Sequence, residues 1–383
     1  MRVLIINSVC GIRSTGRICA ELAEQFTEQG DEVKIAYGRM DDVPEKYRKY
    51  AVRIGTKWDC LFHVLRTRVL DQHGFGSIRA TKSFLRWAEK FHPDLVWLHN
   101  IHDYYINVEL LFEWIKKHPD MDVRWTLHDC WAFTGHCSHF TAVKCEQWKA
   151  HCSDCSQLRR YPSCYGKGNV YLNYERKKAA FTGVKHMEVI APSQWLANLV
   201  KQSFLKEYPI MVHYNTINTD VFKPTSSDFR EQYGLQNKFI VLGVASTWDE
   251  RKGLQDFCQL AQMLSERYAI VLVGLSKKQL ENLPRQITGL RGTNDTKELA
   301  EIYTAADVFV NPSVEETFGL TSVEALACGT PDIVYAGTAC EEIARKDGSG
   351  KSRVVPQDIN ALYQAVIEMS LNGKEIHEAG ENL

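Results

Sequence analysis

The stretch VFVNPSVEETFGLTSVEALACGTP at residues 308–331 decides the fold of this chain. Its first part, Val308–Asn311, is a short apolar run of the kind that forms a buried strand. A loop containing glycine follows, and a helix is predicted from about Thr321, with Gly329 and Pro331 ending it. A strand that leads through a loop into a helix is the repeating unit of a parallel sheet covered by helices, so the stretch predicts an α/β fold.

The same alternation of short apolar runs and amphipathic stretches continues along the chain. The runs predicted as buried strands are Val3–Ile6, Val33–Tyr37, Leu95–His99, Val123–His128, Val189–Ala191, Phe239–Ala245, Ala269–Gly274, Val308–Asn311 and Ile333–Tyr335. A chain of 383 residues is too long for one ordinary core. A polar, turn-prone stretch at 215–224, which ends in proline, separates the two series. We therefore predict two Rossmann-like α/β domains, residues 1–216 and 217–383.

The composition excludes several classes of protein. A net charge of −1 gives no reason to expect nucleic-acid binding, and the chain has no apolar run of the roughly 18 residues that a transmembrane helix needs. The apolar run near the N-terminus, residues 3–6, is too short for a secretory leader and predicts a first strand. We therefore expect a cytosolic protein, in which the 12 cysteines are thiols or metal ligands before they are disulfides.

The loop and helix start after Val308–Asn311 have the features of an anion site. The first turn of a helix leaves backbone N–H groups unpaired, and the helix dipole adds positive charge there. The backbone groups predicted to hold a phosphate are those of Phe318, Gly319, Leu320 and Thr321. Glu316 and Glu324 flank this site and would repel a phosphate unless each accepts hydrogen bonds from hydroxyls, one from a sugar and the other from a ribose. The alternative is a strand–helix corner with two solvated glutamates.

A second signal follows the strand predicted at Phe239–Ala245. Arg251 and Lys252 lie beside a helix start, where two cations suit a diphosphate and would neutralise the charge that grows on a leaving nucleoside diphosphate. The alternative is an ordinary pair of solvated surface cations.

The N-terminal half offers a glycine and two histidines. Gly16 lies in a segment that is not a GxGxxG fingerprint, so neither NAD nor FAD is expected. His99 and His128 end neighbouring predicted strands, and such positions in a doubly wound sheet point toward the ligand crevice. A structural role for either histidine is the alternative.

Residues from about 130 to 168 break the strand–helix pattern and hold six of the 12 cysteines. Cys137, Cys145, Cys152 and Cys155 are predicted as a structural zinc site, because an irregular insertion needs another source of folding energy in a reducing compartment. The alternative is that the thiols pack as small hydrophobic groups among the insertion's aromatic side chains.

The segment Lys57–Lys90 mixes apolar and basic side chains. The apolar ones are Trp58, Leu61, Phe62, Leu65, Phe84 and Leu85, and the basic ones are Arg66, Arg68, Arg79, Lys82 and Arg86. A basic amphipathic helix can lie on an anionic membrane, so peripheral membrane contact is one expectation. The alternative is two helices that pack onto the first sheet.

The spacing from Glu316 to Glu324, with its flanks from Asn311-Pro312-Ser313 to Gly329-Thr330-Pro331, resembles the Glu-x7-Glu signature of retaining glycosyltransferases of family 4. The resemblance implies the GT-B fold, in which two Rossmann-like domains face each other across a cleft. It implies that Glu316 contacts the donor sugar and Glu324 the ribose diol. It also assigns phosphate binding to Lys252, a donor-sugar contact to His128 and the first-loop glycine to Gly16. The family usually carries an arginine where this chain has Ser246, and Arg251 is the expected substitute.

The stretch Trp125–Cys137 narrows the resemblance to the branch of colanic-acid and capsular polysaccharide glycosyltransferases. This implies a UDP- or GDP-sugar donor, a lipid-linked or oligosaccharide acceptor in bacterial surface polysaccharide synthesis, and no metal in catalysis. The alternatives are a GT-B sugar epimerase and an inactive glycosyltransferase-like binding subunit. The final Glu381-Asn382-Leu383 is interpreted as a protease-site remnant, so a truncated C-terminus is expected.

Overall fold

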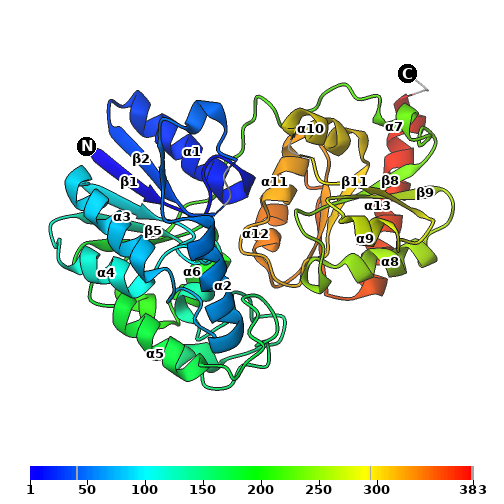
Figure 1. Ribbon diagram of the computed structural model, residues 1–383. Coiled ribbons are helices and arrows are strands. Elements are labelled where there is room, and N and C mark those ends of the chain that lie inside the picture. The colour runs from blue at the N-terminus through cyan, green and yellow to red at the C-terminus, as the bar shows by residue number, and fades with distance from the viewer. Residues whose placement is uncertain (40–41, 294, 381–383) are drawn as a thin grey trace. The chain divides into compact units, whose positions relative to one another are not determined.

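The computed structural model of the chain describes residues 1–39, 42–293 and 295–380 (Figure 1). It divides into two compact units, Met1–Tyr214 and Asn215–Leu383. Each unit is built on one sheet whose neighbouring strands are parallel, with helices between successive strands. The predicted class, α/β with two Rossmann-like domains, is confirmed. The remnant proposed at Glu381–Leu383 lies outside the described residues.

The first unit contains a seven-stranded sheet in the order β3-β2-β1-β4-β5-β6-β7. Its strands are β1 (Arg2–Ile6), β2 (Glu32–Tyr37), β3 (Ala51–Arg53), β4 (Leu95–Leu98), β5 (Asp122–Thr126), β6 (Met187–Ala191) and β7 (Ile210–Val212). Its helices are α1 (Arg13–Glu28), α2 (Lys57–Leu70), α3 (Ile78–Phe91), α4 (Val108–Lys116), α5 (Val170–Phe181) and α6 (Gln194–Val200).

The central strand β1 shows how this sheet is covered on both faces. Successive side chains of a strand point to opposite faces, and all four apolar residues of β1 are fully buried. Val3 and Ile5 pack with Ala20 of α1 in one cluster. Leu4 and Ile6 belong to the other cluster, which holds residues of α3 and α4. A strand buried on both faces therefore has the continuous apolar run that the sequence shows.

The second unit contains a six-stranded sheet in the order β10-β9-β8-β11-β12-β13. Its strands are β8 (Phe239–Val244), β9 (Tyr268–Val273), β10 (Ile287–Leu290), β11 (Val308–Asn311), β12 (Asp332–Tyr335) and β13 (Arg353–Val355). Its helices are α7 (Phe229–Gln232), α8 (Leu254–Met263), α9 (Lys277–Leu280), α10 (Thr296–Ala305), α11 (Leu320–Ala327), α12 (Ala339–Arg345) and α13 (Ile359–Gly380).

Both sheets contain a point at which the strand order reverses. In the first unit β1 lies between β2 and β4, and in the second β8 lies between β9 and β11. Chain segments that leave the two strands at such a point diverge to opposite faces of the sheet and leave a crevice at the carboxyl ends. A ligand site is therefore expected after β1 and β4 in the first unit, and after β8 and β11 in the second.

The predicted insertion is irregular in the structure. Between β5 and α5, the described backbone forms only two short 3₁₀ turns, Trp131–Phe133 and Gln147–Lys149. Its core is aromatic: the Phe140 and Trp148 ring centroids are 4.8 Å apart, and the Phe133 and Trp148 ring centroids are 5.3 Å apart.

Among the residues described, none of the helices is long and apolar enough to cross a membrane.

Candidate functional site

Two loops meet at the reversal point of the second sheet. One follows β8 and carries Arg251 and Lys252 in a 3₁₀ turn, and the other follows β11 and carries Glu316. The backbone N–H of Val314 donates to the Arg251 carbonyl at 3.0 Å, and the Arg251 guanidinium donates to the Glu315 carbonyl at 3.0 Å. These cross-connections hold the predicted cation pair and the predicted glutamate side by side.

Lys252 and Glu316 form an ion pair, and both side chains are mostly buried. The turn that carries the lysine is fixed by Asp249, whose carboxylate accepts the Lys252 backbone N–H at 3.0 Å. The pair neutralises Glu316, which removes the repulsion that a bare carboxylate would exert on a nearby phosphate. The structure thus brings together the two residues predicted to hold the donor's phosphate and its sugar.

Two glycines let these loops approach each other and the neighbouring helix. Gly253 has φ +75°, and a Cβ built on it would lie 2.6 Å from Cγ of Pro312. Gly319 has φ +92°, and its Cβ would lie 2.5 Å from Sγ of Cys340. Any other residue would be strained at both positions and would push the loops apart.

Helix α11 begins directly after Gly319, and no side chain caps its first turn. Its start therefore presents backbone N–H groups and the positive end of the helix dipole, as the sequence predicts. Helix termination is confirmed as well: α11 ends at Ala327, and Gly329 adopts φ +84°. Phe318 is buried, whereas Leu320 and Thr321 are half-buried at the helix start.

Glu324 lies one turn further into α11 and is almost fully buried. Tyr303 of α10 donates its hydroxyl to Glu324 Oε2 at 3.0 Å. This hydrogen bond orients the carboxylate, and the sequence did not predict Tyr303 as a partner of Glu324. No local pattern could have revealed it, because the two residues belong to different helices.

The resemblance implied that Gly16 lies in the first loop. In the structure Gly16 lies inside α1. Its carbonyl accepts the Gly11 backbone N–H at 3.0 Å. A Cβ on Gly16 would meet Cγ2 of Val9 at 3.0 Å, so the glycine allows the loop after β1 to fold tightly against the helix.

His99 and His128 lie together after β4 and β5, with His99 Nδ1 3.0 Å from His128 Nε2. Burial lowers the pKa of His128 to about 4 and holds the pKa of His99 well below its ordinary value. Both imidazoles are therefore neutral, and one donates to the other. His99 Nε2 is buried without a hydrogen-bond partner among the described residues. Both rings line a small pocket of about 190 Å³.

The same pocket contains a charged pair that sequence reasoning missed. His102 Nε2 lies 3.0 Å from Asp129 Oδ2. Burial opposes the charged form of both groups, but the ion pair outweighs it, raising the pKa of His102 and holding the pKa of Asp129 well below its usual range. Tyr161 of the insertion donates its hydroxyl to Asp103 Oδ1 at 2.6 Å and lies 3.3 Å from His102 Nδ1. The insertion therefore supports one wall of the histidine pocket.

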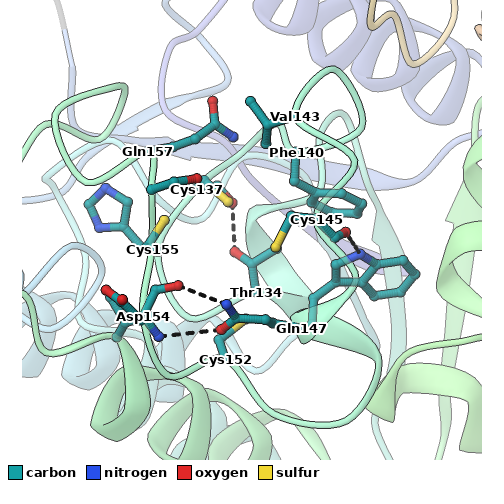
Figure 2. A pocket seen from close by; sticks show the side chains of 14 residues that line it. Thr134, Cys137, Phe140, Val143, Cys145, Gln147, Cys152, Asp154, Cys155 and Gln157 are labelled. Atoms are coloured by element: carbon teal, nitrogen blue, oxygen red, sulfur yellow. Dashed lines mark hydrogen bonds between the residues drawn. The ribbon is translucent and has the colours of Figure 1, made fainter.

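The four cysteines predicted to bind zinc line one pocket of about 350 Å³ in the insertion (Figure 2). All are free thiols, and Cys137 is hydrogen-bonded to Cys155. Within residues 1–39, 42–293 and 295–380, no three or more His, Cys, Asp or Glu side chains are arranged to hold a metal ion. The thiols also pack beside Phe140 and Trp148, as the alternative interpretation expects.

Each half of the chain matches a family of sugar-transferring enzymes. Residues 15–221 match the family described as Glycosyltransferase Family 4, and residues 238–372 match the group described as Glycosyl transferases group 1. The chain belongs to glycosyltransferase family 4, and it is a glycosyltransferase.

Individual relatives agree with this assignment. The chain is 22% identical over 384 residues to WcaC of Escherichia coli K12, assigned as a colanic acid biosynthesis glycosyl transferase, covering 95% of this chain and 90% of that protein. It is 30% identical over 181 residues to the O-antigen chain mannosyltransferase RfbU of Salmonella typhimurium, covering 44% of this chain and 47% of that protein.

Solved structures share the fold. A sucrose-phosphate synthase from Thermosynechococcus elongatus has a TM-score of 0.70 at 19% identity, covering 97% of this chain and 90% of that one. HepE of Anabaena, solved with UDP-glucose, has a TM-score of 0.63 at 15% identity, covering 98% and 91%. The two parallel-sheet units are those of the GT-B glycosyltransferases, as the resemblance implied.

Proposed function

We propose that this chain transfers a sugar from a UDP- or GDP-sugar to a lipid-linked glycan, with retention of anomeric configuration, in the synthesis of a bacterial surface polysaccharide. The observation that carries the proposal is the ion pair of Lys252 and Glu316 beside the uncapped start of α11. The pair lies with a helix dipole at the reversal point of one sheet, which supports phosphate binding by Lys252 and sugar binding by Glu316.

Each part of the donor is assigned to a part of this site. The backbone from Phe318 to Thr321 and the cations Arg251 and Lys252 hold the diphosphate. Glu324 accepts hydrogen bonds from the ribose hydroxyls, and the hydrogen bond from Tyr303 fixes its carboxylate for that role. Glu316 accepts from hydroxyls of the transferred sugar.

The first unit contributes to the same reaction in this proposal. The neutral His128 contacts the transferred sugar, and His99 holds its ring through the hydrogen bond between them. We assign the loop after β1, which the hydrogen bond from Gly11 to the Gly16 carbonyl closes, to the donor phosphate.

The reaction we propose is a front-face displacement. The bond between the anomeric carbon and the diphosphate oxygen breaks, and the acceptor oxygen bonds to that carbon from the same face. The acceptor proton passes to the leaving diphosphate, so atoms and charge balance without a covalent enzyme intermediate. The enzyme stabilises the growing diphosphate charge with Lys252, Arg251 and the start of α11, and no metal ion is required.

The relatives support the donor and pathway classes. The UDP-glucose in the HepE structure favours a uridine nucleotide, and the colanic-acid and O-antigen assignments of WcaC and RfbU favour a surface polysaccharide. Thermal unfolding with UDP-, GDP- and dTDP-sugars identifies the nucleotide, because a ligand that binds the folded state raises the Tm. Transfer of a labelled sugar to lipid-linked acceptors, followed by NMR of the new linkage, tests the reaction and its stereochemistry. Conversion of the donor sugar without any acceptor would indicate an epimerase, and donor binding without turnover on any acceptor would indicate an inactive binding subunit.

We also propose that the insertion holds a structural zinc ion on the thiols of Cys137, Cys145, Cys152 and Cys155. The support is that all four line one pocket in a segment with almost no regular backbone structure. The side chains would have to turn inward to reach a tetrahedral arrangement, with the thiolates as soft ligands. Purification without chelator should give about one zinc per chain. Cys155→Ser should lose the metal and lower the Tm, whereas Cys258→Ser, on α8, should do neither. Clearly substoichiometric zinc in a folded, active enzyme would rule the site out.

A further inference from the structure

Helix α2 turns its apolar side chains away from the first unit. Its buried residues are Cys60, His63 and Thr67, two of which are polar. Of its large apolar residues, Val64 is half-buried and Leu70 is 44% exposed, whereas five others are between 52% and 69% exposed: Trp58, Leu61, Phe62, Leu65 and Val69. These five residues recur at helical spacing along one face, and we call them the α2 stripe.

The buried face of α2 is held by specific hydrogen bonds. His63 Nε2 accepts the backbone N–H groups of Gly74 and Gly76, each at 3.1 Å. The Cys60 thiol donates to the Gly38 carbonyl at 3.2 Å. A rotation of the helix that buried the α2 stripe against the first unit would break these contacts and expose His63. The exposure of the stripe is therefore fixed by the fold.

The surroundings of the stripe are positively charged. Exposed Lys57, Arg66 and Arg68 lie on the same helix, and its one acidic residue, Asp59, is engaged in the capping box with Thr56. The chain as a whole carries a net charge of −1, so this is a local concentration of positive charge.

An exposed aromatic residue extends the surface at the C-terminal end of α2. Tyr165 of the insertion donates its backbone N–H to the Arg68 carbonyl at 2.7 Å, and its side chain is 62% exposed. Arg159 lies over the Tyr165 ring at 5.5 Å, which adds another cation beside an aromatic group. A tyrosine with neighbouring arginines is a typical composition for the headgroup region of a bilayer.

We infer that α2 lies on an anionic membrane, with the α2 stripe in the boundary between headgroups and acyl chains and the basic side chains on lipid phosphates. Charge complementarity favours this occupant over a second copy of the chain. A symmetric contact through the stripe would bring Arg66 and Arg68 of two copies close to each other, at an electrostatic cost. Helix α3 also belongs to the predicted basic segment, but its Phe84 is buried. Within this segment we therefore expect only α2 to present an apolar face to the membrane.

Vesicle sedimentation of the full chain tests this surface without donor or acceptor, so its outcome does not depend on the proposed reaction. Vesicles of phosphatidylcholine with phosphatidylglycerol should bind the protein, and pure phosphatidylcholine vesicles should bind it far more weakly. The variant Leu61→Gln/Phe62→Gln/Leu65→Gln should lower binding by roughly tenfold or more. Arg66→Gln/Arg68→Gln should lower binding to the anionic vesicles by roughly fivefold per charge, and high salt should do the same to the parent protein.

The matched control is Met211→Gln, which changes an equally exposed apolar residue on β7, and it should bind as the parent does. Thermal unfolding of each variant separates lost binding from lost folding, and exposed positions on α2 should leave the Tm nearly unchanged. Two results would overturn the inference. One is no binding of the folded parent to anionic vesicles at low salt. The other is a dimer in sedimentation velocity that the stripe variant dissociates, which would identify the surface as an interface between copies.

Discussion

Glu316 and Glu324 belong to one sequence signature but lie in different surroundings. Glu316 is paired with Lys252, whereas Glu324 is buried and accepts a hydrogen bond from Tyr303. A carboxylate paired with the proposed phosphate-binding lysine is suited to accepting hydrogen bonds from the sugar hydroxyls beside that phosphate. A carboxylate fixed by a neutral hydroxyl is suited to accepting hydrogen bonds from a ribose diol. The two residues should therefore respond differently to mutation.

Glu324→Ala should weaken binding of both the free nucleoside diphosphate and the nucleotide sugar, by roughly 10- to 100-fold, because the ribose contact is common to both. Glu316→Ala should spare the free nucleotide and reduce sugar transfer. Titration calorimetry with both ligands measures the difference, and Glu281→Ala, at an exposed site in the same unit, serves as control. Equal losses of nucleotide affinity in the two variants would contradict these assignments.

The two glycines Gly319 and Gly234 allow the local crowding at the donor site to be measured. Both have positive φ, but a Cβ on Gly234 meets nothing within 4 Å, whereas one on Gly319 meets the Cys340 sulfur. Gly234→Ala should cost about 1 kcal/mol from backbone strain alone. Gly319→Ala should cost about 2–4 kcal/mol in unfolding free energy because overpacking is added, and it should weaken donor binding.

Urea denaturation measures both values, and a second substitution checks the cause. Gly319→Ala with Cys340→Ala should recover part of the lost stability, since the smaller side chain relieves the contact. Equal costs for Gly319→Ala and Gly234→Ala would show that the approach of α12 does not constrain the loop.

At the scale of elements, α2 and the loop after it are held together by a neutral histidine. His63 Nε2 accepts two backbone N–H groups, so a proton on that nitrogen would remove both hydrogen bonds. Burial accordingly lowers the pKa of His63 to about 3. Burial lowers the pKa of His73, His99 and His128 in the same direction. The first unit therefore keeps a set of histidines uncharged.

The pH dependence of stability follows from these directions. Because the folded-state pKa of His63 lies below its unfolded value, its contribution is fully present above about pH 6.5 and is lost as the pH falls toward 3. Once the unfolded histidine is protonated, each further pH unit of acidification should lower the free energy of unfolding by about 1.4 kcal/mol for each such histidine. His63→Asn should reduce the slope of unfolding free energy against pH by an amount that approaches one proton as the pH falls to 5, measured by urea denaturation between pH 7 and pH 5. The exposed His186→Asn is the control, and an unchanged slope in His63→Asn would contradict the assignment.

At the scale of the whole molecule, the chain repeats one plan twice. Each unit has its own parallel sheet, its own cores and its own reversal point in the strand order. In the second unit the reversal point explains why Lys252 and Glu316 come from loops that follow neighbouring strands, β8 and β11. In the first unit His99 follows β4, which lies at the reversal point, whereas His128 follows the next strand, β5.

Transfer activity should survive removal of divalent metal ions if, as we propose, Arg251, Lys252 and the start of α11 supply the positive charge that a magnesium ion would otherwise provide. The measurement is the initial rate directly after addition of EDTA. A slow loss of activity that parallels a falling Tm would reflect removal of the proposed structural zinc and not of a catalytic metal. An immediate loss that Mg²⁺ or Mn²⁺ reverses would contradict the metal-independent mechanism.

The interior strands of both sheets could be predicted from the amino-acid sequence alone. All nine predicted strands exist, and the four that it missed, β3, β7, β10 and β13, are the edge strands of the two sheets. An interior strand is buried on both faces and needs a continuous apolar run, which is visible in the sequence. An edge strand of three or four residues is only partly buried and need not be apolar throughout: polar residues or glycine interrupt β3, β10 and β13, and β7 is apolar but only three residues long.

The tertiary structure decided which side chains meet. Local spacing and the family resemblance placed Glu316, Glu324, Lys252 and His128, because each lies in a motif that is continuous in the chain. The contacts of Tyr303 with Glu324 and of His102 with Asp129 form only through folding, because each joins residues of different elements, although Asp129 itself lies in the Trp125–Cys137 stretch. The outward face of α2 was equally undetermined, because an amphipathic pattern does not say which face is buried. The hydrogen bonds from the backbone of Gly74 and Gly76 to His63 hold one face of α2 against the first unit, and they form only when the chain has folded.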